Sequence, residues 1–295
     1  MASKQEIRLR TISSLILWSV VLFLLFWDNW LGRIGCWVVI TFFGLMGQWE
    51  FYQAVGARGF LLYRKSGLFC GLLLFLSSLW FLILQPELAD FSWVAVSAIL
   101  VASIVGGLIR MVVAGPPREN PVVSLGLTVF GLVYVPYLFN YVCRVAFLEE
   151  PLPPGHTGGF ILLYLLVVTK MSDVGAFVFG SLFGRHKMAP NISPGKTWQG
   201  FAGGCLTSLA SSLLLMALCG GQLAGLQWLD AVILGLLLPV AAAIGDLAES
   251  VVKRDFRIKD SGTSIPGIGG ALDLIDSILF TAPVLYFYLY FITLA

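Results

Sequence analysis

Long apolar runs separated by short polar breaks make up most of this chain. Nine runs can be distinguished, at about residues 11–27, 35–47, 67–84, 91–109, 121–148, 160–184, 198–220, 229–252 and 275–294. A helix needs about 20 apolar residues to cross the hydrocarbon core of a bilayer. The second run is shorter, and we expect its helix to continue through residues 49–52. The pattern predicts an all-α polytopic integral membrane protein with about nine transmembrane helices.

The composition agrees with this pattern and excludes several other classes of protein. Of the 295 residues, 58 % are hydrophobic and 12 % are charged, and the mean hydropathy is +0.91. A soluble domain carries about 25 % charged residues, so an ordinary soluble enzyme is excluded. The five cysteines are scattered, without a CxxC pair or a His/Cys cluster, and we expect neither a disulfide framework nor a zinc site. The first run lacks a small-residue cleavage site, which favours a span over a signal peptide.

The lysines and arginines are distributed unevenly between the two sides of the predicted spans. Fifteen fall in the N-terminal segment and the second, fourth, sixth and eighth loops, whereas Arg33 and Arg144 lie on the opposite side. Because cytoplasmic loops carry the basic excess, we expect a cytoplasmic N-terminus and a C-terminus outside. We divide the chain into residues 1–159, with spans one to five, and residues 160–295, the candidate catalytic region with cytoplasmic loops 185–197 and 253–274.

Six charged residues fall within or at the ends of the last four runs, in three pairs spaced i,i+3. The pairs are Lys170–Asp173, Asp246–Glu249 and Asp273–Asp276. A charge near the bilayer centre costs at least about 2.5–3.5 kcal/mol, so these residues are functional candidates, with an interhelical ion pair as the structural alternative for the first pair. Neighbouring carboxylates repel each other and need a cation or a proton. Oxygen ligands without His or Cys favour a hard cation such as Mg²⁺.

Two predicted cytoplasmic loops combine basic residues with glycines. The segment 253–270 has four basic residues and three glycines that would let backbone N–H groups approach a phosphate: Lys253, Arg254, Arg257, Lys259, Gly267, Gly269 and Gly270. Its basic run is also typical of a positive-inside anchor in contact with anionic lipid. In the segment 184–200, Ser193 or Thr197 would cap the following helix, and Lys196 beside a helix N-terminus would suit a phosphate.

Carboxylates for a metal, next to cations and glycines for phosphates, indicate phosphoryl or nucleotidyl transfer on a lipid substrate. Positioning and electrostatics would supply the rate in such a reaction. We assign no role to His156, and His186 fits a phosphate-adjacent residue better than a base.

The residues from 250 to 276 resemble the signature of the CTP:phosphatidate cytidylyltransferases, also called CDP-diacylglycerol synthases. The matching positions are Ser250, Lys253, Arg254, Lys259, Asp260, Gly262, Ile265, Pro266, Gly267, Gly269, Gly270, Asp273 and Asp276. Residues 245–250 are similar to the family's GDLxES element and residues 193–200 to its SPxKTWEG element. Residues 170–177 are similar to its K-x-x-D-x-[GA]-[AY] segment. Ile268, Leu274 and Gln199 depart from the family's His, Arg and Glu.

The resemblance implies that CTP and phosphatidic acid give CDP-diacylglycerol and pyrophosphate, in phospholipid biosynthesis at the inner membrane. It implies catalytic roles for Asp246, Asp273, Asp276, Lys253 and Arg254. It implies substrate and phosphate binding by Ser193, Pro194, Lys196, Thr197, Lys259, Asp260, Gly267, Gly269 and Gly270. Mg²⁺ would bind Asp246, Asp273 and Asp276, with Glu249 and Asp173 as further candidates and a second, monovalent cation nearby. The implied partners are CTP, phosphatidic acid and membrane lipid, with no nucleic acid, and a homodimer stays open.

Two other functions stay open at this stage. A CTP-dependent kinase of a polyprenol or phytol-like alcohol would also need a nucleotide and apolar spans, but it would transfer the γ-phosphoryl group. A non-enzymatic transporter is the other reading, because pairs such as Lys170 and Asp173 occur on ion paths. The lack of an internal repeat argues against the transporter.

Overall fold

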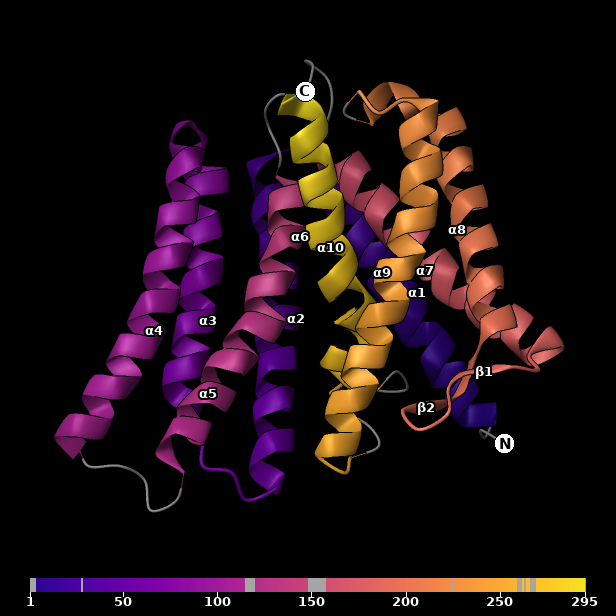
Figure 1. Cartoon of the computed structure of the whole chain (residues 1–295). Helices are drawn as coiled ribbons and strands as arrows, with labels where there is room; N and C mark the ends of the chain where they lie inside the picture. The colour runs from indigo at the N-terminus through magenta and orange to yellow at the C-terminus, as the bar shows by residue number, and fades with distance from the viewer. Residues whose placement is uncertain are drawn as a thin grey trace. The chain divides into compact units, whose positions relative to one another are not determined.

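The computed structural model describes residues 4–27, 29–114, 120–147, 158–223, 225–258, 262, 264–265 and 269–294. Within these residues nearly the whole chain is helical, and the strands are confined to one short hairpin (Figure 1). In the described part of the chain, eight helical segments are long and apolar enough to cross a membrane. The structure therefore confirms an all-α polytopic membrane protein.

The first predicted span is helical. Helix α1 (Lys4–Phe26) covers it, and the part whose side chains the structure describes includes the apolar segment Ile12–Phe26. Helix α2 (Trp30–Ala57) is longer than the second apolar run, residues 35–47. It includes residues 49–52, through which we expected this helix to continue.

Two spans contain wide π-helical turns. Helix α3 (Arg64–Ser78) continues into η1 (Leu79–Leu84), and α5 (Pro121–Leu132) continues through η3 (Val133–Tyr137) into α6 (Leu138–Ala146). Pro136 lies inside η3. A proline lacks the N–H group and its ring clashes with the preceding turn, so a locally widened turn lets the helix continue past it.

The chain divides into two compact units, formed by residues 1–143 with 255–275 and by residues 144–254 with 276–295. In the first unit, η2 (Pro86–Phe91) leads into α4 (Ser92–Ala114), which packs against α3 and α5. Leu74, Val96 and Leu132 from these three helices form a buried apolar cluster. The buried Tyr52 hydroxyl donates to the Thr128 carbonyl oxygen at 2.7 Å and ties α2 to α5.

The second unit contains α7 (Gly158–Phe183), the hairpin of β1 (Lys187–Ala189) and β2 (Ser193–Thr197), and α8 (Trp198–Cys219) with the short η4 (Gly220–Gln222). Most of helix α9 (Trp228–Asp255) and of helix α10 (Ala271–Leu294) follows, while Asp255 and the first turn of α10, up to Ile275, belong to the first unit. Helices α7 and α8 lie side by side along their length (Figure 1). Glycine permits this approach, since a Cβ on Gly175 would lie 1.9 Å from Thr207 Oγ1.

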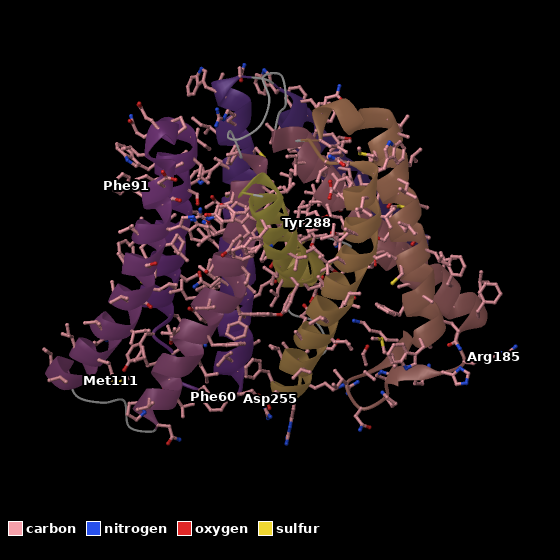
Figure 2. All side chains as sticks on the ribbon, turned by 45° about the horizontal axis from the view of Figure 1, so that its top comes forward. Phe60, Phe91, Met111, Arg185, Asp255 and Tyr288 are labelled. Atoms are coloured by element: carbon pink, nitrogen blue, oxygen red, sulfur yellow. The ribbon has the colours of Figure 1, made fainter. Side chains whose placement is uncertain are left out.

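Large apolar side chains are exposed on many of these helices. Phe91, labelled in Figure 2, is 57 % exposed, and Val112 on α4 is 85 % exposed. So much exposed apolar surface would cause association in water, but it is the expected surface of helices in lipid. The exposure supports the assignment of these helices as membrane spans.

Candidate active site

The hairpin before α8 positions the predicted phosphate-binding residues. Strand β2 carries Ser193, Pro194 and Lys196, and it pairs antiparallel with β1. Thr197 is the N-cap of α8, and its side-chain oxygen accepts a hydrogen bond from the Gly200 backbone N–H at 3.1 Å. Thr197 is thus the capping residue of the two that the sequence allowed. Lys196 directly precedes the N-cap residue, so it lies next to the N-terminus of α8.

Gln199 stabilises the same hairpin. Its Oε1 accepts hydrogen bonds from the backbone N–H groups of Arg185 and His186, each at 3.1 Å, and its Nε2 lies 2.7 Å from His186 Nδ1. A glutamate would accept the same two N–H groups but would lack the amide donor. The exchange of Glu for Gln therefore retains the acceptor function at this position and adds a contact with His186.

Three carboxylates meet around one hydroxyl in the second unit. Ser277 Oγ lies 2.6 Å from Asp246 Oδ1, 3.2 Å from Asp276 Oδ1 and 3.3 Å from Asp173 Oδ2. The Ser277 backbone N–H also donates to Asp276 Oδ1 at 2.6 Å. These residues come from α7, α9 and α10, so the tertiary fold brings together acidic groups that are distant in sequence.

Two lysines border the carboxylates. Lys170 Nζ lies 3.4 Å from Asp173 Oδ2, which confirms the expected i,i+3 pair on α7. Lys196 Nζ lies 3.1 Å from Asp246 Oδ2, so the two side chains form an ion pair, but they are not aligned for a hydrogen bond. We call Lys170, Asp173, Lys196, Asp246, Asp276 and Ser277 the polar cluster. The side chains of Asp246 and Lys196 are 28 % and 26 % exposed, while the Lys196 Nζ atom itself is buried.

The C-terminal turns of α9 carry the next two predicted residues. Lys253 Nζ forms an ion pair with Glu249 Oε2 at 2.8 Å, and the Glu249 side chain is 5 % exposed. Arg254 Nε donates to the Ile192 carbonyl oxygen and so connects the end of α9 to the hairpin. Lys253 thus neutralises a buried carboxylate, and Arg254 holds the hairpin that carries Lys196.

The first unit contains Asp273, which lies in the first turn of α10. Asp273 Oδ2 accepts a hydrogen bond from the Gly270 backbone N–H at 3.0 Å. Gly269, with a φ of +123°, adopts a conformation that favours glycine. Lys259, Asp260 and Gly267 lie outside the described residues. The predicted convergence of Asp273 with Asp246 stays a prediction.

Sequence analysis missed Glu50, which caps α10 from another helix. Glu50 is 3 % exposed, and its carboxylate accepts the backbone N–H groups of Ala271 at 3.0 Å and Leu272 at 2.9 Å and the Ser264 hydroxyl. Gly270 occupies the N-cap position without a side chain, so α2 supplies the missing acceptor. A Cβ on Gly270 would lie 2.8 Å from Glu50 Oε2, which explains the glycine.

Glu50 and Ser277 were not among the predicted site residues, but each carried a weak signal in the sequence. Glu50 is a single acidic residue inside an apolar helix, and Ser277 directly follows an acidic residue of the last span. A charge in a span indicates a partner but does not identify it. Their partners are set by the packing of helices that are distant in sequence.

The polar cluster offers oxygen donors of the kind that Mg²⁺ prefers. Among the residues that the structure describes, no group of three or more His, Cys, Asp or Glu side chains is arranged to hold a metal ion. The carboxylates instead bind Ser277 and the two lysines. The donor chemistry therefore fits a hard cation, and the magnesium site stays a prediction.

Comparison with known proteins finds relatives that match part of the chain. It is 41 % identical over 132 residues to the uncharacterized protein YnbB of Escherichia coli, a segment that covers 45 % of this chain and 43 % of that protein. It is 36 % identical over 175 residues to a phosphatidate cytidylyltransferase of Mycobacterium leprae, with 59 % and 53 % covered. It is 33 % identical over 193 residues to a phosphatidate cytidylyltransferase of Haemophilus influenzae, with 63 % and 66 % covered.

The matched segments thus span between 43 % and 66 % of these relatives' lengths. The match to a family model is more extensive, since the model described as the cytidylyltransferase family covers residues 8–292. This range includes the polar cluster, the hairpin and the helix with Glu50. The chain belongs to the cytidylyltransferase family.

Proposed function

We propose that this protein is a phosphatidate cytidylyltransferase, which converts CTP and phosphatidic acid to CDP-diacylglycerol and pyrophosphate. The observation that carries the proposal is the polar cluster, in which three carboxylates and two lysines meet beside a helix N-terminus. The family match and two relatives that bear this name support the choice of reaction.

In the proposed reaction, an oxygen of the lipid phosphate forms a bond to the α-phosphorus of CTP. The bond from that phosphorus to the bridging oxygen breaks, and pyrophosphate leaves with the electron pair. No protein nucleophile is needed, because the lipid phosphate is itself the nucleophile. Catalysis then depends on positioning the two phosphates and on stabilising negative charge in the transition state.

The lysines of the polar cluster would bind the phosphates. Lys196 projects beside the N-terminus of α8, where backbone dipoles also favour an anion. Arg254 holds the hairpin, so it would orient Lys196. The Ser277 hydroxyl, shared by three carboxylates, would keep those side chains in one place before substrate binds.

Asp246 and Asp276, with Asp173 beside them, are the residues that would hold Mg²⁺, and Asp273 and Glu249 are further candidates. When bound, the ion would neutralise charge on the triphosphate and on the pyrophosphate leaving group. A second, monovalent cation belongs to the same proposal.

We further propose that the protein lies in the inner membrane with its site facing the cytoplasm, where CTP is present. The positive-inside distribution of Lys and Arg supports this orientation. A homodimer is a further proposal. Cross-linking in native membranes would test the dimer, and reporter fusions at the two chain ends would test the orientation.

The test uses CTP labelled at either the α- or the γ-phosphate, with purified protein, Mg²⁺ and phosphatidic acid in mixed micelles. Cytidylyl transfer puts the α label into lipid and releases the γ label as pyrophosphate. The Asp276→Asn variant should lose this activity, and Asp90→Asn, at an exposed position of η2, should retain it. Absence of labelled lipid would overturn the proposal. Transfer of the γ label to a polyprenol or phytol-like alcohol would indicate the lipid kinase instead.

A further inference from the structure

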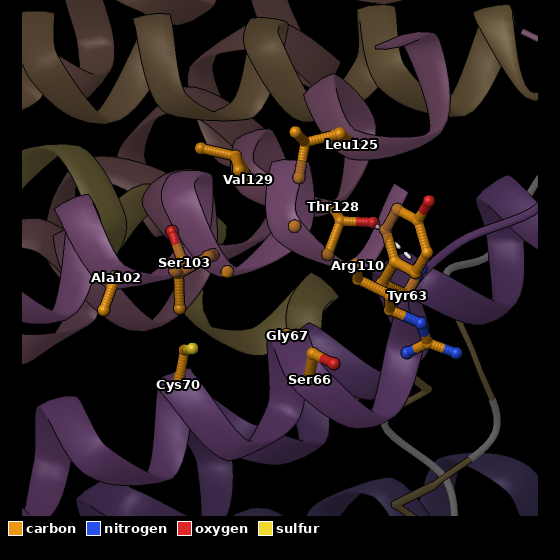
Figure 3. Close-up of a pocket in the computed structure, with 13 residues that line it drawn as sticks. Tyr63, Ser66, Gly67, Cys70, Ala102, Ser103, Arg110, Leu125, Thr128 and Val129 are labelled. Carbon is orange, nitrogen blue, oxygen red and sulfur yellow. Dashed lines mark hydrogen bonds between the residues drawn. The ribbon is translucent and has the colours of Figure 1, made fainter. Parts of the chain in front are cut away.

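A cavity in the first unit is lined by none of the residues assigned to the reaction. It has a volume of about 180 Å³ and lies between α3, α4 and α5 (Figure 3). Small residues of α3 and α4 form much of its wall, among them Gly67, Cys70, Ala102 and Gly106. Leu125 and Val129 of α5 face them and make that side apolar.

One end of the cavity is polar. The Arg110 guanidinium lies 5.0 Å from the centre of the Tyr63 ring, and both residues line the cavity. Among the residues that the structure describes, no carboxylate forms an ion pair with Arg110, whose residue surface is exposed. The Tyr63 hydroxyl is buried and has no hydrogen-bond partner in that part of the chain. The cavity thus has a cation at one end, and the rest of its wall combines apolar groups with the side chains of Ser66, Ser103 and Thr128.

The helices around the cavity face lipid. On α4, Val105 is 46 % exposed, Leu108 is 48 % exposed and Ile109 is 57 % exposed. The Ser103 and Thr128 hydroxyls donate to carbonyl oxygens of their own helices, so little of the wall is left to hold ordered water, which needs two to four polar partners. In a membrane the available apolar occupant is an acyl chain, and an arginine near the interface attracts an anionic head group.

We propose that this cavity binds one glycerophospholipid with a negatively charged head group. Its phosphate would contact Arg110, and one acyl chain would fill the space beside Gly106. The occupant is a bound lipid and not a reactant, because none of the cavity residues belongs to the polar cluster. The proposal therefore does not depend on the proposed reaction.

Two glycines give a matched pair of variants. A Cβ on Gly106, which lines the cavity, would have no atom within 4 Å, and the same holds for Gly126 on α5, which does not line it. Gly106→Leu should place its side chain in the lipid's space, whereas Gly126→Leu adds the same bulk outside the cavity. The readout is native mass spectrometry of the full chain, delipidated in detergent and titrated with phosphatidylglycerol, phosphatidic acid or phosphatidylcholine.

The wild type and Gly126→Leu should retain one tightly bound phosphatidylglycerol that Gly106→Leu lacks. Arg110→Gln should weaken that binding about fivefold relative to phosphatidylcholine. Retention of both phosphatidylglycerol and phosphatidic acid by the protein would indicate a site for anionic phospholipids in general. Retention of phosphatidic acid alone would indicate a site that reads the phosphate monoester. Equal binding in the two glycine variants, or no head-group preference in the wild type, would overturn the proposal.

A second measurement covers the case in which Gly106→Leu does not fold. Cys70 lines the cavity, so phosphatidylglycerol should slow its alkylation by N-ethylmaleimide in the wild type. Phosphatidylcholine should have a smaller effect, and Arg110→Gln should remove the difference between the two lipids. An alkylation rate that is independent of the lipid would contradict the proposal.

Discussion

The cap that Glu50 provides for α10 gives a prediction about both stability and activity. The Glu50 carboxylate accepts two backbone N–H groups, at 3.0 and 2.9 Å, and the Ser264 hydroxyl, in a site where the residue is 3 % exposed. In Glu50→Gln, one oxygen still accepts the Ala271 N–H, but the amide NH₂ then faces the Leu272 N–H. Two donors in contact cannot form a hydrogen bond, so one buried N–H group loses its partner.

The magnitude follows from the bonds that are lost. A hydrogen bond to a charged group contributes about 1.5–3 kcal/mol, so we expect Glu50→Gln to destabilise the protein by about 2 kcal/mol. Glu50→Ala leaves both N–H groups and the hydroxyl without an acceptor and should cost about 3–5 kcal/mol. The matched control is Glu87→Gln, at an exposed position of η2, which should change stability by less than about 0.5 kcal/mol.

The assay is denaturant unfolding in mixed micelles, followed by tryptophan fluorescence. Cytidylyl transfer is measured on the folded fraction of each variant. Because Asp273 lies in the turn that Glu50 caps, we expect Glu50→Gln to lower turnover as well as stability. If Glu50→Gln and Glu87→Gln unfold at the same denaturant concentration, the cap does not stabilise α10 and the reasoning is refuted.

Three further predictions concern the site. Ser277→Ala removes the hydroxyl that lies among three carboxylates and should lower turnover about 10- to 100-fold. Ser97 is exposed and bonded within its own helix, so Ser97→Ala should not lower turnover. Equal rates in the two variants would contradict the positioning role of Ser277. Gln199→Leu removes the acceptor of the Arg185 and His186 N–H groups and should raise the KM for CTP severalfold. Gln199→Glu keeps the acceptor, so its KM should stay near that of the wild type. An unchanged KM in Gln199→Leu would show that the hairpin does not contribute to CTP binding. Chelation with EDTA should abolish cytidylyl transfer and Mg²⁺ should restore it, and full activity in EDTA would refute the metal assignment.

The sequence predicted the membrane spans because helix formation in lipid is a local requirement. Every backbone polar group in a span must be bonded within its own helix, so apolar length alone predicts most of the helices. The i,i+3 pair of Lys170 and Asp173 was predictable for the same reason, since helical periodicity places both on one face. The hairpin was harder to predict, because its two strands are short and the segment is rich in Gly and Pro.

By itself, the sequence determined the class of protein and the acidic and basic residue types of the site, and it left Ser193 and Thr197 as candidate caps, of which the structure has Thr197. Only the tertiary structure decided the partners: Ser277 with Asp246, Lys196 with Asp246, and Glu50 with the N-terminus of α10. These pairs are separated by 31 to 222 positions in sequence, so no local periodicity relates them. The packing of whole helices sets those distances, and it depends on small residues such as Gly175 and Gly270 that admit close neighbours.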